Sequence, residues 1–443
     1  MTALLLTAVL AVLATQQPDL RDAESVTRLL ASLRTAEPAV CELAGRSLTN
    51  FGGWNGWDGN DPMPAPMPMP MPVPMPMPFA ERGVGVSAPK IGRLGRNEMD
   101  PRALAAYRTA LRDQSRCVRR IAARIVARER PAWAAAEFAA LAKDAEAGYR
   151  EIGILGLGEL EDPKSIGAVT AGLTDGDAAV RAVAAWALGQ LELAEAIPAL
   201  GRALGDESVI VRRRATWALG EIEDVTALPH LEKALRDKAP EVRRMAAWAL
   251  GEVESAKAVP VLRGALTDTD WETRRTAVWA LGEIEDPAAV DVLAPLVKDG
   301  DARVRRMAAW ALGEIENARA VPVLAPLVRD GDRDVKLTAL WALGEIESAD
   351  SVNVVAPALK DADPSVRRMA AWALGEIEAV GAVGSLTPLL TDPQADVRTV
   401  VAWALGQIES ASALPALAAV KGDSSPAVRR AVQWAIAQID DRR

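Results

Sequence analysis

Tryptophan recurs at a fixed interval of 31 residues through most of this 443-residue chain. The text around it recurs too, because residues 242–254 are repeated almost unchanged around Trp310 and Trp372. The register runs without insertion from Val118 to Val428, and Arg124 and Leu155 take the tryptophan place in two early units. Self-similarity at such a period is the signature of a stacked repeat array. The repeated tryptophans are Trp186, Trp217, Trp248, Trp279, Trp310, Trp341, Trp372, Trp403 and Trp434.

Each unit is predicted to contain two helices. Residues 256–266 have helical apolar spacing, with Pro260 in the first turn, where its missing N–H costs little. Residues 267–270 form a turn, and a second helix is expected over 271–285. Strict periodicity without a strand pattern predicts an all-α fold, an α-solenoid of about twelve 31-residue repeats. Prolines deeper in the first helix should kink it, namely Pro295, Pro326, Pro357 and Pro388.

The array is expected to occupy residues 101–443, with a degenerate first repeat at 19–50. Between them, residues 51–100 form a Gly/Trp-rich and Pro-Met-rich loop or linker, because alternating proline favours polyproline II. The six methionines between Pro62 and Pro78 suggest Cu(I) binding, but alternate side chains of polyproline II diverge, so we favour a linker over a metal site.

The N-terminus is predicted to be a signal peptide, residues 1–14. The apolar run from Ala3 to Ala14 is too short to span a bilayer, and Val12 and Ala14 suit cleavage. The run lacks a preceding Lys or Arg, and an uncleaved anchor or a buried first helix is the alternative. We therefore expect a secreted or periplasmic protein with no membrane span after cleavage.

The repeated text resembles the HEAT-like repeat named after phycobilisome lyases, whose pattern is close to Val-Arg-x-x-Ala-Ala-x-Ala-Leu-Gly-x-Ile. The resemblance covers about residues 101–443, with a partial copy at about 20–50. It implies the solenoid fold. It implies less about function, because the family includes bilin lyases, enzyme subunits and binding scaffolds.

A helical wheel divides the second helix into two faces. Counting from tryptophan, positions −6, −2, +2 and +5 are apolar and form the predicted core face, whereas tryptophan lies opposite, between positions −4 and +4. The resemblance places this tryptophan side on the concave surface. The polar residues there are Arg213, Arg244, Arg275, Arg306, Arg368, Glu221, Glu252, Glu283, Glu314 and Glu376.

This stripe has two interpretations. Exposed Trp with Arg is typical of binding hot spots, which predicts a partner-binding surface. Alternatively, the tryptophans cover one another and the arginine stems, and the ladder is structural.

Three other columns are predicted to be structural. An aspartate eleven residues before each tryptophan caps a helix start and bridges to an arginine five residues before it, as in many HEAT repeats. Eight glycines, Gly189 to Gly406, lie three residues after tryptophan, where the next unit must pack closely. The aspartates are Asp175, Asp206, Asp237, Asp268, Asp299, Asp330, Asp361, Asp392 and Asp423.

The amino-acid composition argues against several classes of catalytic, metal-binding and nucleic-acid-binding site. The single histidine, His230, disfavours triads and histidine metal sites, and two cysteines cannot build a four-thiolate zinc site. The net charge of −9 argues against nucleic-acid binding. We expect no enzyme activity, catalytic residue, metal or cofactor, and no small-molecule ligand.

Residues 81–130 are locally basic, with 13 Lys and Arg against 5 Asp and Glu. Such a region could contact an anionic surface or another copy of the acidic array. Cys41 and Cys117 flank equivalent valines in units that become neighbours if the Pro-Met segment loops out, which predicts a disulfide in an oxidising compartment.

The leading functional prediction is an exported scaffold whose concave face binds a protein or peptide, with a second copy of the chain as one candidate. Two alternatives stay open: a bilin-lyase-like enzyme or enzyme subunit, and a self-assembling, fibre-forming protein.

Overall fold

The computed structural model describes residues 22–34 and 99–441. All regular structure in these ranges is helical, as the repeat pattern predicts for an α-solenoid. They fall into two compact units, which divide between Ala249 and Leu250 within α13 (Pro240–Glu252). The proposed signal segment 1–14 lies outside the described residues, as does nearly all of 51–100.

The first unit begins with α2 (Ala23–Arg34), which lies in the expected degenerate repeat and packs against α4 and α5. The pairs that follow alternate a short first helix with a longer second helix. The first helices are α4 (Pro101–Ala110), α6 (Ala134–Leu141), α8 (Ile166–Gly172), α10 (Ile197–Ala203) and α12 (Leu228–Ala234). The second helices are α5 (Arg116–Glu129), α7 (Ala147–Glu159), α9 (Ala178–Gln190) and α11 (Val209–Glu221).

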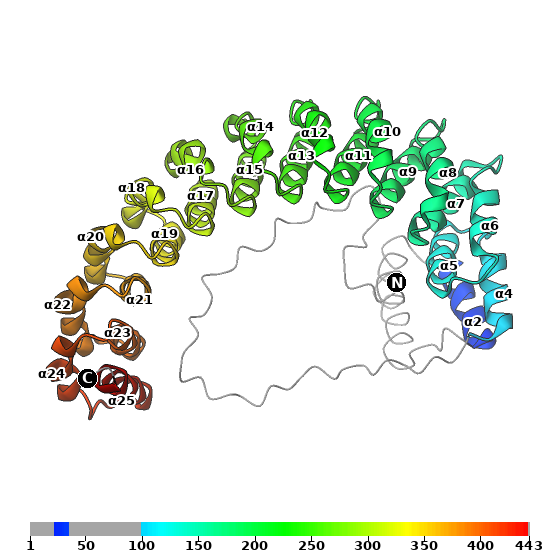
Figure 1. The fold of residues 1–443 in the computed structure, drawn as a ribbon. Helices are drawn as coiled ribbons and strands as arrows, with labels where there is room; N and C mark the ends of the chain where they lie inside the picture. Colours follow the sequence, from blue (N-terminus) through cyan, green and yellow to red (C-terminus); the bar gives the residue numbers. More distant parts are fainter. Residues whose placement is uncertain (1–21, 35–98, 442–443) are drawn as a thin grey trace, which may run out of the picture. The chain divides into compact units, whose positions relative to one another are not determined.

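The second unit repeats this arrangement, and Figure 1 shows its long helices side by side in one row with the short helices in another. The short first helices are α14 (Val259–Leu262), α16 (Ala289–Leu293), α18 (Val321–Leu324), α20 (Val352–Val355), α22 (Val383–Leu386) and α24 (Leu414–Ala419). The second helices are α15 (Trp271–Glu283), α17 (Ala302–Glu314), α19 (Arg333–Glu345), α21 (Pro364–Glu376), α23 (Ala395–Gln407) and α25 (Pro426–Asp441).

The second helices have recurrent start and stop signals, which α17 illustrates. The Asp301 side chain accepts a hydrogen bond from the Arg303 N–H, which satisfies one of the free donors of the first turn. The helix ends at Glu314, and Glu316 then adopts a left-handed backbone with φ of 47°. This conformation commonly ends helices, but glycine usually occupies it.

A break in the first helix coincides with a proline or a glycine fifteen residues before tryptophan, and with Gly264 there α14 has four residues. With Arg202 or Lys233 at the position fifteen residues before tryptophan, α10 and α12 each run for seven α-helical residues. With Pro295 there, α16 has five residues, and a 3-10 helix follows at Ala294–Lys298. The expected kink is therefore a change of helix type, because proline removes an N–H donor and clashes with the preceding turn.

The predicted core face is confirmed. Around Trp310, the four apolar positions Val304, Ala308, Leu312 and Ile315 are all buried. They face the short first helices and the neighbouring second helices, so each repeat completes the core of the next.

Candidate partner-binding surface

The repeated tryptophans pack against the preceding repeat. A Cβ built on Gly313 would lie 2.8 Å from Cζ3 of Trp341 and 2.9 Å from Cβ of Ala342. The same contact recurs in the first unit, where a Cβ on Gly189 would lie 2.7 Å from Cζ3 of Trp217. The predicted reason for the glycine column, close packing by the next unit, is confirmed.

This packing bears on the two interpretations of the tryptophan stripe. Trp186, Trp217, Trp248, Trp279, Trp310 and Trp372 are buried, and Trp341, Trp403 and Trp434 are half-buried. The wheel treated each helix alone, so it missed that the side opposite the core is covered by the adjacent second helix. The burial favours the structural interpretation, and binding of a partner by these rings stays a prediction.

Two polar columns flank the tryptophans and stay nearer the surface. Arg213, Arg244, Arg275, Arg306 and Arg368 are half-buried, and so are Glu221, Glu252, Glu314 and Glu376, whereas Glu283 is exposed. Arg306 reaches Asp334 of the next repeat at 3.5 Å. The Arg275 and Arg303 guanidinium carbons lie 5.3 Å and 3.4 Å from the ring centre of Trp271, which is not a member of the repeated column.

The glutamates at the ends of α15, α17, α19 and α21 lie in an acidic setting. Burial raises the pKa of Glu314, and the neighbouring carboxylates of Glu283, Glu285, Glu345 and Glu316 raise it further. Burial is also the largest cause of the raised pKa of Glu283, Glu345 and Glu376. Each of these four residues is the last of its helix, where the helix dipole also disfavours negative charge.

Sequence reasoning missed a second glutamate column, two residues further on. Its members have left-handed backbones with φ between 45° and 51°. The signal was visible, because the repeated segment 242–254 carries both Glu252 and Glu254. The column consists of Glu161, Glu192, Glu223, Glu254, Glu285, Glu316, Glu347, Glu378 and Glu409.

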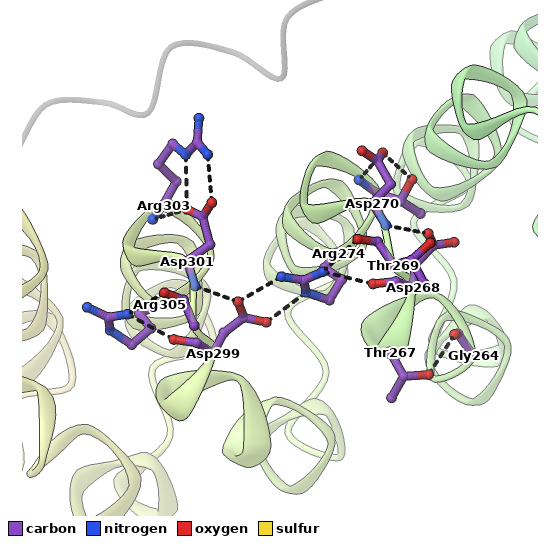
Figure 2. Close-up of polar contacts among 12 residues, drawn as sticks. Gly264, Thr267, Asp268, Thr269, Asp270, Arg274, Asp299, Asp301, Arg303 and Arg305 are labelled. Atoms are coloured by element: carbon purple, nitrogen blue, oxygen red, sulfur yellow. Dashed lines mark hydrogen bonds and ion pairs between the residues drawn. The ribbon is translucent and has the colours of Figure 1, made fainter.

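The opposite ends of the second helices carry paired charges. Figure 2 shows Arg274 donating to the Asp299 carboxylate through Nε at 2.7 Å and Nη2 at 2.9 Å, while Arg305 Nη1 donates to the Asp299 carbonyl at 2.8 Å. Hydrogen bonding by Arg305 lowers the pKa of Asp330, the next member of the column. The ion pairs between successive repeats are Arg150–Asp175, Arg181–Asp206, Arg212–Asp237, Arg274–Asp299, Arg305–Asp330, Lys336–Asp361, Arg367–Asp392 and Arg398–Asp423.

The predicted bridging role of this column is confirmed, but its predicted capping role is wrong. The Asp299 side chain accepts the N–H of Asp301, and Asp301 is the residue that caps α17. The aspartate column thus anchors the turn and the preceding repeat, and the cap lies two residues later.

A buried ion pair substitutes for tryptophan in the first unit. Arg124, at the tryptophan place, is buried and lies 3.2 Å from Glu159 of the next repeat. Burial raises the pKa of Glu159, and the Arg124 charge opposes that effect.

One cysteine of the predicted disulfide lies within the described residues. Cys117 is disulfide-bonded. Cys41 lies outside the described residues, so the Cys41–Cys117 pair stays a prediction.

Within residues 22–34 and 99–441, no three His, Cys, Asp or Glu side chains are grouped to hold a metal ion. No helix of these ranges has the length and apolar character needed to cross a membrane.

Comparison with known proteins identifies the family. The model of HEAT repeats matches seven overlapping segments that together cover residues 134–443: 134–213, 166–240, 201–271, 228–303, 264–335, 324–402 and 383–443. The chain therefore belongs to the HEAT repeat family. No curated protein sequence matches it significantly.

Solved structures agree on the fold. A chain of the Kap95p–RanGDP structure matches with a TM-score of 0.58 and 15% identity, over 98% of this chain and 63% of that one. An engineered protein matches with a TM-score of 0.44 and 23% identity, over 76% of this chain and 98% of that one. The complex of CpcE and CpcF of phycocyanin lyase from Nostoc matches with a TM-score of 0.32 and 24% identity, over 50% of this chain and 91% of that one. The first of these matches supports the shared fold and nothing finer.

Proposed function

We propose that this protein is a non-enzymatic scaffold that binds a protein or peptide along the row of second helices. HEAT-repeat solenoids commonly mediate protein binding, because stacked repeats create long continuous surfaces. The concave face is the proposed location.

One observation carries the proposal: the arginine and glutamate columns recur although the close apolar contact between repeats is made by other residues. Trp, Ala and Gly make the close contact, as Trp341 and Ala342 do with Gly313. Arg368 and Glu376 recur beside that contact and stay half-buried at the surface. A row of identical polar groups over an apolar base suits recognition of an extended partner.

Site-specific cross-linking tests this proposal. A photoreactive residue replaces Arg306 or Arg368 in the second-helix row, and Lys298 or Arg329 in the first-helix row serves as the matched control. We expect adducts only from the second-helix row. A dimer adduct would identify a second copy as the partner, and equal labelling from both rows would refute the proposed surface.

We further propose that the protein is exported and works in a secreted or periplasmic setting. The apolar run Ala3–Ala14 supports this, because its length suits a signal-peptide core. Cell fractionation with N-terminal sequencing tests it, and a cytosolic protein that begins at Met1 would refute it.

A further inference from the structure

One edge of the second unit carries carboxylates without counter-ions. We call these eight residues the glutamate edge, and they come in pairs at the ends of four successive second helices. None of them forms an ion pair in the part of the chain that the structure describes. They are Glu283, Glu285, Glu314, Glu316, Glu345, Glu347, Glu376 and Glu378.

Two features of the fold act against the glutamate edge. Its first members end helices, where negative charge meets the negative end of the dipole. Its second members, such as Glu316, hold a left-handed backbone that glycine would adopt more easily. The aspartates at the other end of the same helices are paired repeat by repeat, so the lack of partners is specific to this edge.

An unpartnered indole N–H lies one helical turn before the same edge. In three repeats, hydrogen bonding from a tryptophan indole counteracts the rise in the pKa of the glutamate four residues later, namely in the pairs Trp279–Glu283, Trp341–Glu345 and Trp372–Glu376. Trp310 occupies the equivalent place beside Glu314 and is 6% exposed, yet its Nε1 has no hydrogen-bond partner. A buried donor of this kind needs an acceptor, and the carboxylate that its neighbours use is not bonded to it.

The unpaired negative charge of the glutamate edge and the unpartnered N–H of Trp310 define the chemistry of the ligand. A metal ion would supply charge but no acceptor, and no described group of three carboxylates could hold one. The basic first unit of a second copy is a poor match, because Arg108, Arg112 and Arg116 are already paired with Glu137, Asp144 and Glu151. A basic peptide supplies ammonium or guanidinium groups and main-chain carbonyl acceptors together.

We propose that the glutamate edge binds an extended, Lys/Arg-rich peptide segment of a partner protein. The repeat spacing sets the register of that segment. Packed helices lie about 8–10 Å apart, and an extended polyproline II chain rises about 3.1 Å per residue with three residues per turn. Every third side chain of such a chain points the same way, so one basic residue in about every three meets successive repeats. This inference rests on the proposed scaffold function and adds the chemistry of the partner.

Peptide titration tests the inference on the full chain. The probe is a fluorescein-labelled peptide of four Lys-Gly-Ser triplets, and the control probe has Glu in place of Lys. We expect the lysine peptide to bind and the glutamate peptide not to bind, with affinity that falls as salt rises. The glutamine variant of Glu283, Glu314, Glu345 and Glu376 should bind the lysine peptide at least about tenfold more weakly.

A matched variant separates this site from net charge. Glu146, Glu192, Glu195 and Glu223 of the first unit, changed together to glutamine, remove the same four charges and should change affinity by less than about twofold. Equal losses in both variants, or no loss in either, would overturn the inference. The edge variant relieves repulsion, so its melting temperature should not fall, and weaker binding cannot be attributed to unfolding.

The cross-linking experiment distinguishes failure of this inference from failure of the proposed function. If Arg306 and Arg368 positions capture a partner but the lysine peptide neither binds nor competes, only the basic-peptide inference fails. If these positions capture nothing, the scaffold proposal itself fails.

Discussion

Replacing Gly313 by alanine tests whether the glycine column exists for close packing. A Cβ there would lie 2.8 Å from Cζ3 of Trp341, 2.9 Å from Cβ of Ala342 and 3.0 Å from its Cα. Alanine should stabilise the helix by about 1 kcal/mol through its higher propensity, whereas overpacking costs about 1–3 kcal/mol. Because one of the contacts is backbone, which cannot rotate away, we expect a cost of about 2–3 kcal/mol, at the upper end of this range, and so a net loss of about 1–2 kcal/mol.

The matched control is Gly264→Ala. Gly264 has a right-handed helical backbone, and a Cβ there would meet no atom within 4 Å. This change should stabilise the protein by up to about 1 kcal/mol. Repeat arrays can unfold in parts, so denaturant melts should be combined with hydrogen exchange of α17 and α19.

The outcome decides between two explanations of the glycine column. If Gly313→Ala is as stabilising as Gly264→Ala, the next repeat can move away and the packing argument is wrong. If packing is responsible, adding Trp341→Phe to Gly313→Ala should recover part of the loss in a double-mutant cycle, because the smaller ring leaves room for the Cβ.

Three further changes test local features by denaturant melts or titration. Ser351 is fully buried and its hydroxyl has no partner, so Ser351→Ala should stabilise the protein by about 1 kcal/mol. The control is Ser165→Ala, which should destabilise the protein because the Ser165 hydroxyl donates a hydrogen bond to the Asp162 carbonyl at 2.7 Å. Glu316→Gly should be about 1 kcal/mol more stable than Glu316→Ala, because only glycine accepts the left-handed backbone without cost, and equal stabilities would contradict this. The Arg303 side chain lowers the pKa of Asp301 to about 2. The stability that this carboxylate contributes is therefore complete above its usual pKa of 3.8 and is lost as the pH falls toward 2. Arg303→Met should raise the pKa of Asp301, as measured by NMR.

The features that follow from the 31-residue repeat itself could be predicted from the sequence. The regular spacing of Trp310 and its copies predicts the helix pairs. The helical spacing of apolar residues such as Val304 and Leu312 predicts the core face, and both residues are buried. The Arg–Asp ladder was predictable because both residues recur at fixed offsets within one unit. Each of these depends on residues of one repeat and its identical neighbour.

The site was less predictable, because its geometry depends on how repeats cover one another. A wheel for one helix places Trp341 on an outer face, and only stacking shows that it packs over Gly313. The unpartnered N–H of Trp310 could not be expected from a motif that is identical to those around Trp248 and Trp372. Small differences in side-chain placement between identical motifs are invisible in the sequence.

The two ends of each second helix show why recurrence alone does not reveal function. At one end, the aspartates recur and each described pair, such as Arg367–Asp392, joins two repeats, so stability accounts for the recurrence. At the other end, Glu376 and Glu378 recur equally well but form no ion pair within the described ranges. They lie at the unfavourable end of the helix dipole, and one of them holds a backbone better suited to glycine. Hydrogen bonding from the Trp372 indole accounts for part of the recurrence of Glu376, and the proposed cationic partner would account for the unpaired charge at this edge.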